Sequence, residues 1–413
     1  MKLFKCQSCG HLLYFENTRC ESCGHELGYL PEGMTLSALE PDGDVFRPLA
    51  APERAMRYCD NAQYGACNWM VHADGADTLC LACRHNHTIP DLSVPLNLEH
   101  WQRLELAKHT LFYALLRLGL PLANRIDDPE HGLAFDFLAD TPDADAAGGA
   151  TPKVMTGHDN GLITIALAEA DDAERERRRT EMHEPYRSLL GHFRHEVGHY
   201  FWDVLIRDGG RLDDCRTVFG DDSLDYAAAL QAYYQDGPPA DWQDHYISRY
   251  ASMHPWEDWA ETWAHYLHIV DTLEMARAFG IKIQPRISGD ETLSAVIELD
   301  PYNTAAITDI MGAWLPLTFA MNSLNRAMGN PDLYPFVLSP AVVAKLGFVH
   351  EVVRRHAGDA MRGNAGDAMR GNAGDAVRGH AGDVVRGNAG DAVRENAGDA
   401  VPERPAERAS TGG

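Results

Sequence analysis

The sequence has no hydrophobic run long enough to cross a membrane, and its first residues, MKLFKCQSCG, lack the apolar stretch of a signal peptide. It is also poor in basic residues, with 36 Lys and Arg against 61 Asp and Glu in 413 residues and a formal net charge of -25. Phosphate binding needs clustered Lys and Arg, so this balance argues against a nucleic-acid partner. We therefore expect a soluble cytoplasmic protein that binds neither nucleic acid nor membranes.

The nine cysteines fit that compartment if they are reduced or metal-bound, because disulfides do not persist in a reducing cytosol. Two matched CxxC pairs stand near the start of the chain, with ten residues between them. A CxxC on a tight turn directs two thiolates at one ion, and two such turns complete a tetrahedral site. These pairs predict a structural zinc site with four ligands: Cys6, Cys9, Cys20 and Cys23.

A second, less regular group of four cysteines follows, which we interpret as a second zinc site of the ribbon type: Cys59, Cys67, Cys80 and Cys83. Three histidines in the same segment could replace a cysteine that is not a ligand: His72, His85 and His87. Cys215 is left over, and we expect it to be a small buried residue.

The C-terminal region is a repeat. From Ala357 an eight-residue unit of the form AGDAxRGN recurs six times, with few large apolar groups. Such a composition cannot offset the entropy of ordering a packed core. We expect residues 351–413 to be a disordered tail.

Between the cysteines and the tail, the pattern predicts one mixed domain. Residues 97–119 carry apolar side chains at helical spacing and end at glycine and proline, which is typical of a long amphipathic helix. Residues 134–140 and 161–167 have the alternation and the β-branched content of strands. The remainder is mainly helical, so the expected fold class is α+β.

The segment GHFRHEVGHYFWD, residues 191–203, holds the chemistry-bearing motif. Apolar residues at helical spacing predict a helix, on which His195 and His199 lie one turn apart and can both reach one ion. Glu196 projects about 100 degrees around the axis, where it can meet a water bound to the metal. Gly198 inside the helix indicates close packing.

A catalytic zinc needs a third protein ligand, and residues 249–269 offer candidates on a second predicted helix that begins at Pro255. Glu257, Glu261 and His265 recur every four residues along one face, beside aromatic residues. Either glutamate could coordinate the metal, and His254 or His265 could also serve. The plain alternative is an exposed polar face over an aromatic core.

HEVGH followed by EDWAETWAHY resembles the gluzincin pattern of zinc metallopeptidases. The cysteine pairs, TGHDNGLITI and HPWEDWAETWAHYLHI extend the similarity to the bacterial zinc-binding metallopeptidases with an N-terminal zinc ribbon, over roughly residues 1–350. The resemblance implies a zincin-like fold in which Glu257 is the third ligand, Glu261 orients a ligand histidine and Tyr250 donates to the oxyanion. Glu257 is favoured over Glu261 on this ground.

These features predict a metallopeptidase that acts on a peptide or protein substrate, with one catalytic and one or two structural zinc ions. Glu196 would be the general base, and residues 161–167 would form the sheet edge along which the substrate binds. The alternative is a zinc-scaffolded binding or regulatory protein, with a non-catalytic zincin site and ribbons that dock a protein partner. The expected divisions are 1–40 (zinc ribbon), 41–96 (second cysteine-rich segment), 97–350 (peptidase domain) and 351–413 (tail).

Overall fold

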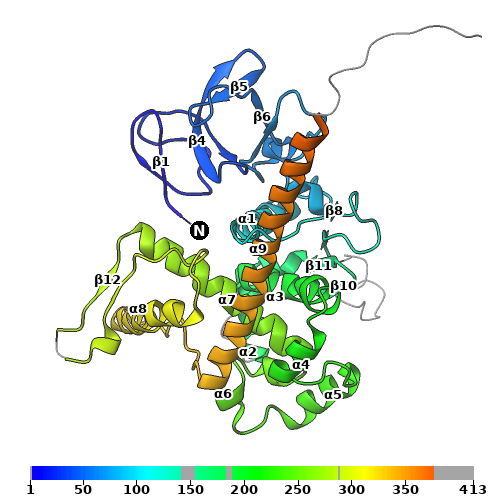
Figure 1. The fold of residues 1–413 in the computed structure, drawn as a ribbon, viewed down its shortest axis with the longest axis vertical. Coiled ribbons are helices and arrows are strands. Elements are labelled where there is room, and N and C mark those ends of the chain that lie inside the picture. Colours follow the sequence, from blue (N-terminus) through cyan, green and yellow to red (C-terminus); the bar gives the residue numbers. More distant parts are fainter. Residues whose placement is uncertain (1, 141–153, 183–187, 287–288, 376–413) are drawn as a thin grey trace, which may run out of the picture. The chain divides into compact units, whose positions relative to one another are not determined.

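A computed structural model of the chain describes residues 2–140, 154–182, 188–286 and 289–375 (Figure 1). Residues 1–362 form one compact unit and residues 363–413 are assigned to a second. The α-helices of the described residues are α1 Pro95–Arg117, α2 Asp172–Met182, α3 Leu189–Trp202, α4 Leu212–Phe219, α5 Tyr226–Asp236, α6 Trp242–His245, α7 Pro255–Ala278, α8 Ile307–Ala327 and α9 Pro340–Asp375.

The strands of the described residues form four small sheets, and most of these strands lie in the N-terminal region or beside α3. The N-terminal strands are β1 Phe4–Lys5, β2 Leu12–Leu13, β3 Leu27–Leu30, β4 Thr35–Asp42, β5 Val45–Pro48, β6 Met56–Tyr58 and β7 Met70–His72. The others are β8 Asn86–Thr88, β9 Ala134–Leu138, β10 Gly157–Asp159, β11 Leu162–Ala166, β12 Lys282–Ile283 and β13 Ala295–Val296. Strands β3 to β7 form one antiparallel sheet in chain order, while β1 pairs with β2 and β12 with β13.

The elements predicted from sequence periodicity are confirmed. The helix expected over 97–119 is α1, and the two expected strands are β9 and β11. The histidine motif lies on α3, and Pro255 occupies the first turn of α7, where its missing N–H has no helical acceptor to lose. The expected mixed α and β architecture is therefore correct.

The sheet edge was predicted wrongly. Strand β11, which contains the GLITIAL segment, lies inside the order β10-β11-β9-β8 and pairs on both sides. The two residues Asn160 and Gly161 turn the chain so that β10 folds back along β11 as an antiparallel neighbour, and both have positive φ. Among the strands that the structure describes, the edge on this side of the sheet is therefore β10, residues 157–159.

Helix α9 continues past the boundary that we expected at residue 351. It runs from Pro340 to Asp375, because Val352 and Val353 continue its buried apolar face. Residues 376–413, which hold the rest of the predicted tail, lie outside the described residues.

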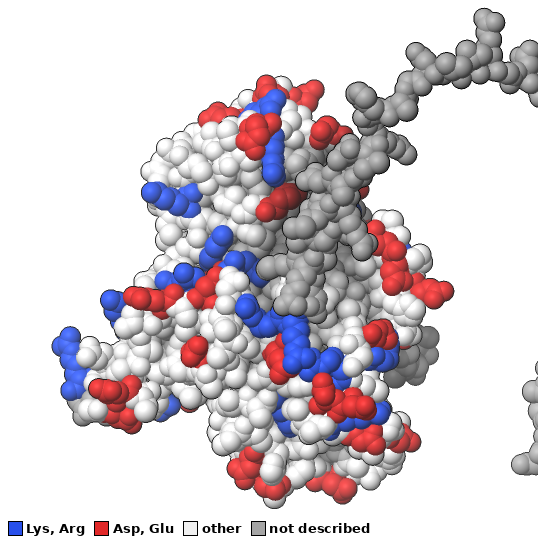
Figure 2. Space-filling view, viewed as in Figure 1, with Lys and Arg blue, Asp and Glu red and all other residues white. Residues whose placement is uncertain are grey.

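The cysteine-rich N-terminal region and the helical domain share one hydrophobic core. Phe15 and Tyr29 pack their rings on Tyr113 of α1, at centroid distances of 5.6 and 6.4 Å. On the face shown in Figure 2, acidic and basic side chains are interspersed over this unit. None of the helices in the described residues is both long and apolar enough to span a bilayer.

Candidate metal centres

The histidine motif is positioned by the close approach of α3 to α7. Gly198 faces α7, and a Cβ placed there would lie 3.2 Å from Cα of Ala260 and 3.1 Å from Cδ1 of Trp263. The indole N–H of Trp259 donates to the carbonyl oxygen of Gly198 at 2.8 Å. The glycine therefore allows the two helices to come together at the turn that carries His199.

Three candidate ligand atoms converge where these helices meet. Oxygen or nitrogen atoms of His195, His199 and Glu257 all lie within 4.8 Å of one another. Nε2 of His195 is 3.1 Å from Oε2 of Glu257, and Nε2 of His199 is 3.6 Å from Oε1. Glu257 is 2% exposed and His199 3%, whereas His195 is partly buried.

Glu261 is not among the converging residues, and it contacts His195 on the side of the ring that faces away from Glu257. Its Oε1 accepts a hydrogen bond from Nδ1 of His195 at 2.7 Å. With Nδ1 acting as donor, the Nε2 lone pair of His195 points at Glu257. This is the geometry of a carboxylate that orients a metal-bound histidine.

The arrangement suits a bound cation, since Nε2 of His195 faces the Glu257 carboxylate at 3.1 Å, and without a metal ion the ring must carry a second proton at that position. Burial lowers the pKa of His195, but the carboxylates of Glu257 and Glu261 raise it well above its ordinary value. Burial raises the pKa of Glu257, and the two histidines hold it below its ordinary value. His199 Nδ1 has no hydrogen-bond partner among the described residues. Two imidazoles and one carboxylate are also a donor set that zinc prefers.

Two tyrosines flank this centre, and only Tyr250 was predicted. Tyr250 lies on the 3-10 turn before α7, with its ring centroid 6.1 Å from that of His195. Tyr226, the first residue of α5, donates its hydroxyl to Oε1 of Glu257 at 2.8 Å and also interacts with the Tyr250 hydroxyl. Burial, and after it the carboxylates of Glu257 and Glu196, raise the pKa of Tyr226, so the phenol is a hydrogen-bond donor at neutral pH.

Glu196 and His158 complete the surroundings. Glu196 follows His195 on α3 and is 9% exposed, and its negative charge contributes to the raised pKa of Tyr226. His158, on the edge strand β10, stacks 6.1 Å from His199, and its Nε2 accepts from the backbone N–H of Gly161 at 2.9 Å. Burial lowers the pKa of His158 to about 3, so this histidine is neutral.

The other residues considered as ligands have different partners. His254 caps α7: its Nδ1 accepts from the backbone N–H of Trp256, and its Nε2 contacts the carbonyl oxygen of Leu224. His265 hydrogen-bonds through Nδ1 to the hydroxyl of Tyr334 at 2.9 Å. Neither histidine is among the converging atoms around His195 and His199.

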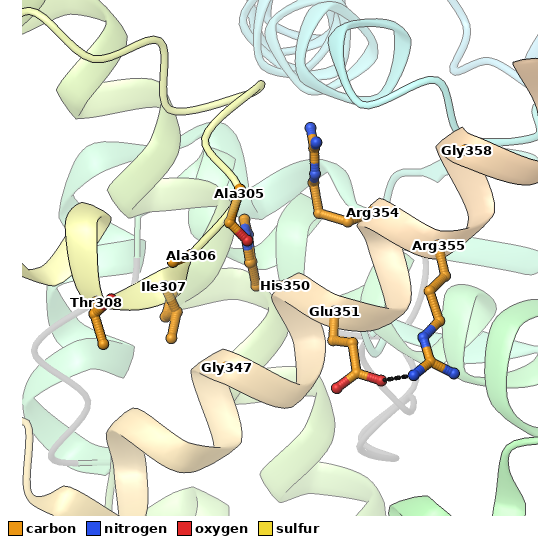
Figure 3. A pocket seen from close by; sticks show the side chains of 10 residues that line it. All are labelled: Ala305, Ala306, Ile307, Thr308, Gly347, His350, Glu351, Arg354, Arg355 and Gly358. Carbon is orange, nitrogen blue, oxygen red and sulfur yellow. Dashed lines mark hydrogen bonds and ion pairs between the residues drawn. The ribbon is translucent and has the colours of Figure 1, made fainter.

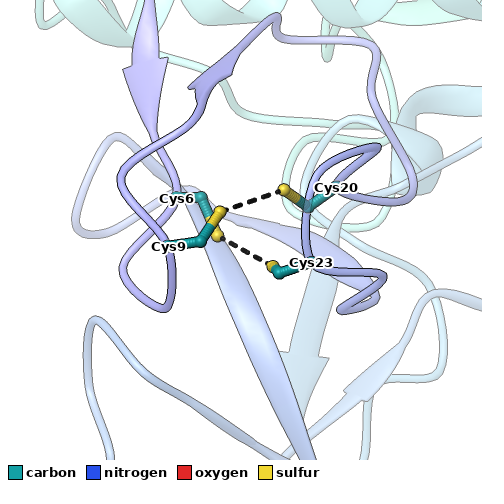
Figure 4. Close-up of side chains that lie close together, drawn as sticks. All are labelled: Cys6, Cys9, Cys20 and Cys23. Carbon is teal, nitrogen blue, oxygen red and sulfur yellow. Dashed lines mark hydrogen bonds between the residues drawn. The ribbon is translucent and has the colours of Figure 1, made fainter.

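The first cysteine quartet is gathered as the spacing predicts. Sγ atoms of Cys6 and Cys23 lie 3.6 Å apart and those of Cys9 and Cys20 3.7 Å apart, and the two turns face each other (Figure 4). These separations match the edges of a tetrahedron with Zn–S bonds of about 2.3 Å. Backbone hydrogen bonding from His11 is the main cause that lowers the pKa of Cys9 to about 6, which favours the thiolate that zinc requires.

The second quartet is also gathered, but its neighbouring histidine was not predicted. The Sγ atoms of Cys59, Cys67, Cys80 and Cys83 lie within 4.8 Å of one another, and all four residues are buried. The three histidines proposed as substitutes contact other groups: His72 contacts Glu32, His85 the carbonyls of Leu81 and Leu122, and His87 the carboxylate of Asp136. The histidine beside the sulfurs is His109 of α1.

Cys215 is buried and belongs to neither quartet; burial raises the pKa of its thiol to about 12, as expected for an inert core residue. A pocket of about 710 Å³ lies between the start of α8 and α9 (Figure 3). Arg355 pairs with Glu351 at its rim, at 2.8 Å. The residues that line it include none of the candidate ligands, so it is separate from all three centres.

Comparison with known proteins agrees with this layout. Residues 97–352 match the family described as "Putative zinc-binding metallo-peptidase", and residues 3–94 match the family described as "zinc-ribbon domain". The chain is 42% identical over 360 residues to an uncharacterized protein of Mycobacterium bovis and to an uncharacterized protein of Mycobacterium tuberculosis. These alignments cover 87% of this chain and 97% of each relative. No solved structure matches the chain significantly.

Proposed function

The chain belongs to the zinc-binding metallopeptidase family, and on that premise we propose that it hydrolyses peptide bonds with a zinc ion held by His195, His199 and Glu257. The observation that carries the proposal is the convergence of these three side chains within 4.8 Å, with Glu196 on the same helix as the histidines. Glu261 then orients His195, and the cysteine quartets hold structural zinc ions.

Zinc, when bound, lowers the pKa of a water molecule towards neutrality and polarises the peptide carbonyl. Glu196 accepts the proton from the attacking water, whose oxygen adds to the carbonyl carbon. Glu196 then gives that proton to the amide nitrogen as the C–N bond breaks. Tyr250 donates a hydrogen bond to the oxygen that gains negative charge.

The substrate chain would bind along β10, because among the described residues this strand pairs on one side only, with β11, and His158 of β10 stacks on His199. An extended peptide added to β10 would pass the catalytic residues in a fixed register. This assignment replaces the segment 161–167, which pairs on both sides.

Zinc content tests the centre directly. Elemental mass spectrometry of the purified protein should find about three zinc ions per chain, and a His195→Ala/His199→Ala variant should retain about two. Equal zinc in both proteins, even after zinc is added back, would mean that the two histidines hold no zinc and that the proposed catalytic centre does not form.

A peptide-library screen then tests the activity. Glu196→Gln is the matched inactive control, since it should keep the metal and lower cleavage by about 10²–10⁴-fold. Full zinc occupancy with no cleavage by either protein would favour the second candidate, a zinc-scaffolded binding protein. The presence of Glu196, which metal binding alone does not need, favours the peptidase.

A further inference from the structure

We infer that the second cysteine site is a latch between the zinc ribbon and the peptidase domain, in which His109 of α1 donates a hydrogen bond to the zinc-binding thiolates. His109 lies outside the residues that match the zinc-ribbon family and inside those that match the peptidase family. The hydrogen bond would therefore join the metal site of one part of the chain to a helix of the other, two parts that the family matches treat separately. This inference does not depend on peptidase activity.

The position of the imidazole carries the argument. Nε2 of His109 lies 3.2 Å from Sγ of Cys67, 3.6 Å from Sγ of Cys83 and 3.8 Å from Sγ of Cys80. These distances suit N–H donors that face sulfur, and the shortest identifies Cys67 as the main acceptor. His109 is 3% exposed, so water does not compete for the contact.

The second ring nitrogen fixes the orientation. Nδ1 of His109 lies 2.6 Å from the carbonyl oxygen of Glu105, one turn earlier on α1. A carbonyl can only accept, so Nδ1 donates, and the ring is held with Nε2 towards the sulfurs. Thiolates also only accept, so a hydrogen on Nε2 is required if the metal is bound by all four cysteines.

The same stretch of α1 buries further charge beside the site. Glu105 and Lys108 are both 0% exposed and pair at 2.9 Å, and Oε2 of Glu105 is 3.7 Å from Sγ of Cys83. Burying such groups on a helix face is costly unless they meet other charges or hydrogen-bonding partners. A zinc ion with four thiolates carries two net negative charges; Lys108 neutralises Glu105, so a His109 ring protonated on both nitrogens would offset one of them.

Aromatic packing surrounds the contact and connects α1 to α3. Trp69, two residues after Cys67, packs edge-on against the His109 ring at 5.2 Å. On the other side, Phe112 of α1 packs on Phe135 of β9, at 6.1 Å, and Phe135 packs on Phe193, at 5.7 Å. Phe193 lies on α3, two residues before the proposed ligand His195. Ring contacts from Phe112 through Phe135 to Phe193 therefore connect α1 with α3.

The test uses the full chain with its zinc replaced by Co²⁺, whose sulfur-to-metal charge-transfer absorption reports the number and hydrogen bonding of the thiolates. His109→Ala should keep four thiolates at the second site but shift this absorption to lower energy in the difference spectrum. It should also weaken metal retention at this site by about 10–100-fold in a chelator competition, as loss of a group that supports a metal ligand does. His109→Gln, which keeps an N–H donor, should restore part of both effects.

His100→Ala is the matched control, because it removes another buried histidine from α1 that is not part of the cysteine cluster. It should leave the spectrum and the metal retention as in the wild type. Two results would overturn the inference. Identical spectra and retention for His109→Ala and the wild type would mean that His109 makes no functional contact. A wild-type spectrum with three thiolates at this site, and complete loss of that metal in His109→Ala, would make His109 a ligand and not a donor.

Discussion

Gly198 of α3 and Ala260 of α7 face each other so closely that a methyl group on the glycine would lie 3.2 Å from the Cα atom of the alanine. The glycine precedes His199, and Ala260 lies between Glu257 and Glu261. The same contact that packs the helices therefore sets the distance between the histidines of one helix and the carboxylates of the other.

Gly198→Ala should destabilise the protein, although alanine normally favours a helix by about 1 kcal/mol over glycine. The added Cβ meets backbone and the fully buried Trp263 ring, neither of which can move freely, so we expect a net loss of about 1–3 kcal/mol in the free energy of unfolding. Denaturant unfolding of the two proteins measures it.

Gly312→Ala on α8 is the matched control. Gly312 is an exposed helix glycine with no atom within 4 Å of an added Cβ, so this change should stabilise the protein by up to about 1 kcal/mol. If both alanine variants were stabilised to the same extent, the contact at Gly198 would not determine the distance between α3 and α7.

Glu261→Gln should weaken zinc binding at the proposed catalytic centre without abolishing it. The neutral amide cannot replace the charged acceptor that Nδ1 of His195 contacts at 2.7 Å, so the ligand loses both orientation and basicity. We expect zinc affinity at this centre to fall by about 10–100-fold, measured by competition with a chelator. Complete loss of the metal is the result we expect when the ligand Glu257 is changed to Gln. The same loss in Glu261→Gln would instead make Glu261 a ligand.

Much of this layout was predictable because the determining signals are local in sequence. The spacing of the cysteines predicted that the first four would cluster, and helical periodicity predicted the helices that carry His195, His199 and Glu257. Helix positions four residues apart share a face whatever the rest of the fold does, so the geometry around each motif needed no tertiary information.

What could not be predicted depends on contacts between distant residues. Tyr226 stands 31 residues before Glu257, and no spacing rule connects them. His109 was not predicted, because α1 was predicted from the spacing of its apolar side chains alone. Glu105 and His109 lie four residues apart on that helix and could have indicated a polar patch in the core. The inner position of β11 required knowledge that the Asn160–Gly161 turn folds β10 back against it.

Phenylalanine substitutions should separate the roles of the two tyrosines. Tyr250→Phe removes the proposed oxyanion donor and should lower kcat by about 10²–10³-fold with little change in zinc content. Tyr226→Phe removes a hydrogen bond to Glu257 and should mainly weaken zinc retention. Rates on one selected peptide, together with zinc per chain, measure both. A large fall in kcat for Tyr226→Phe at full zinc occupancy, with Tyr250→Phe active, would exchange the two assignments.

His265 should make the protein sensitive to acid. Burial lowers the pKa of His265 to about 4, against a smaller opposing effect of Glu261. Because the folded pKa lies below the unfolded value of about 6.5, the unfolded chain takes up a proton first as pH falls, and stability is lost between about pH 6.5 and 4. Linkage over that interval gives a loss of about 2 kcal/mol between pH 7 and pH 5 from this residue alone.

The comparison with His265→Gln isolates this contribution, since the amide can keep a hydrogen bond to the Tyr334 hydroxyl and does not titrate. Unfolding free energies of the two proteins should be measured at pH 7 and pH 5 under the same zinc concentration. The difference between wild type and variant should shift by about 2 kcal/mol in favour of the variant at pH 5. A difference that stays constant with pH would show that His265 takes up its proton equally in the folded and unfolded chains.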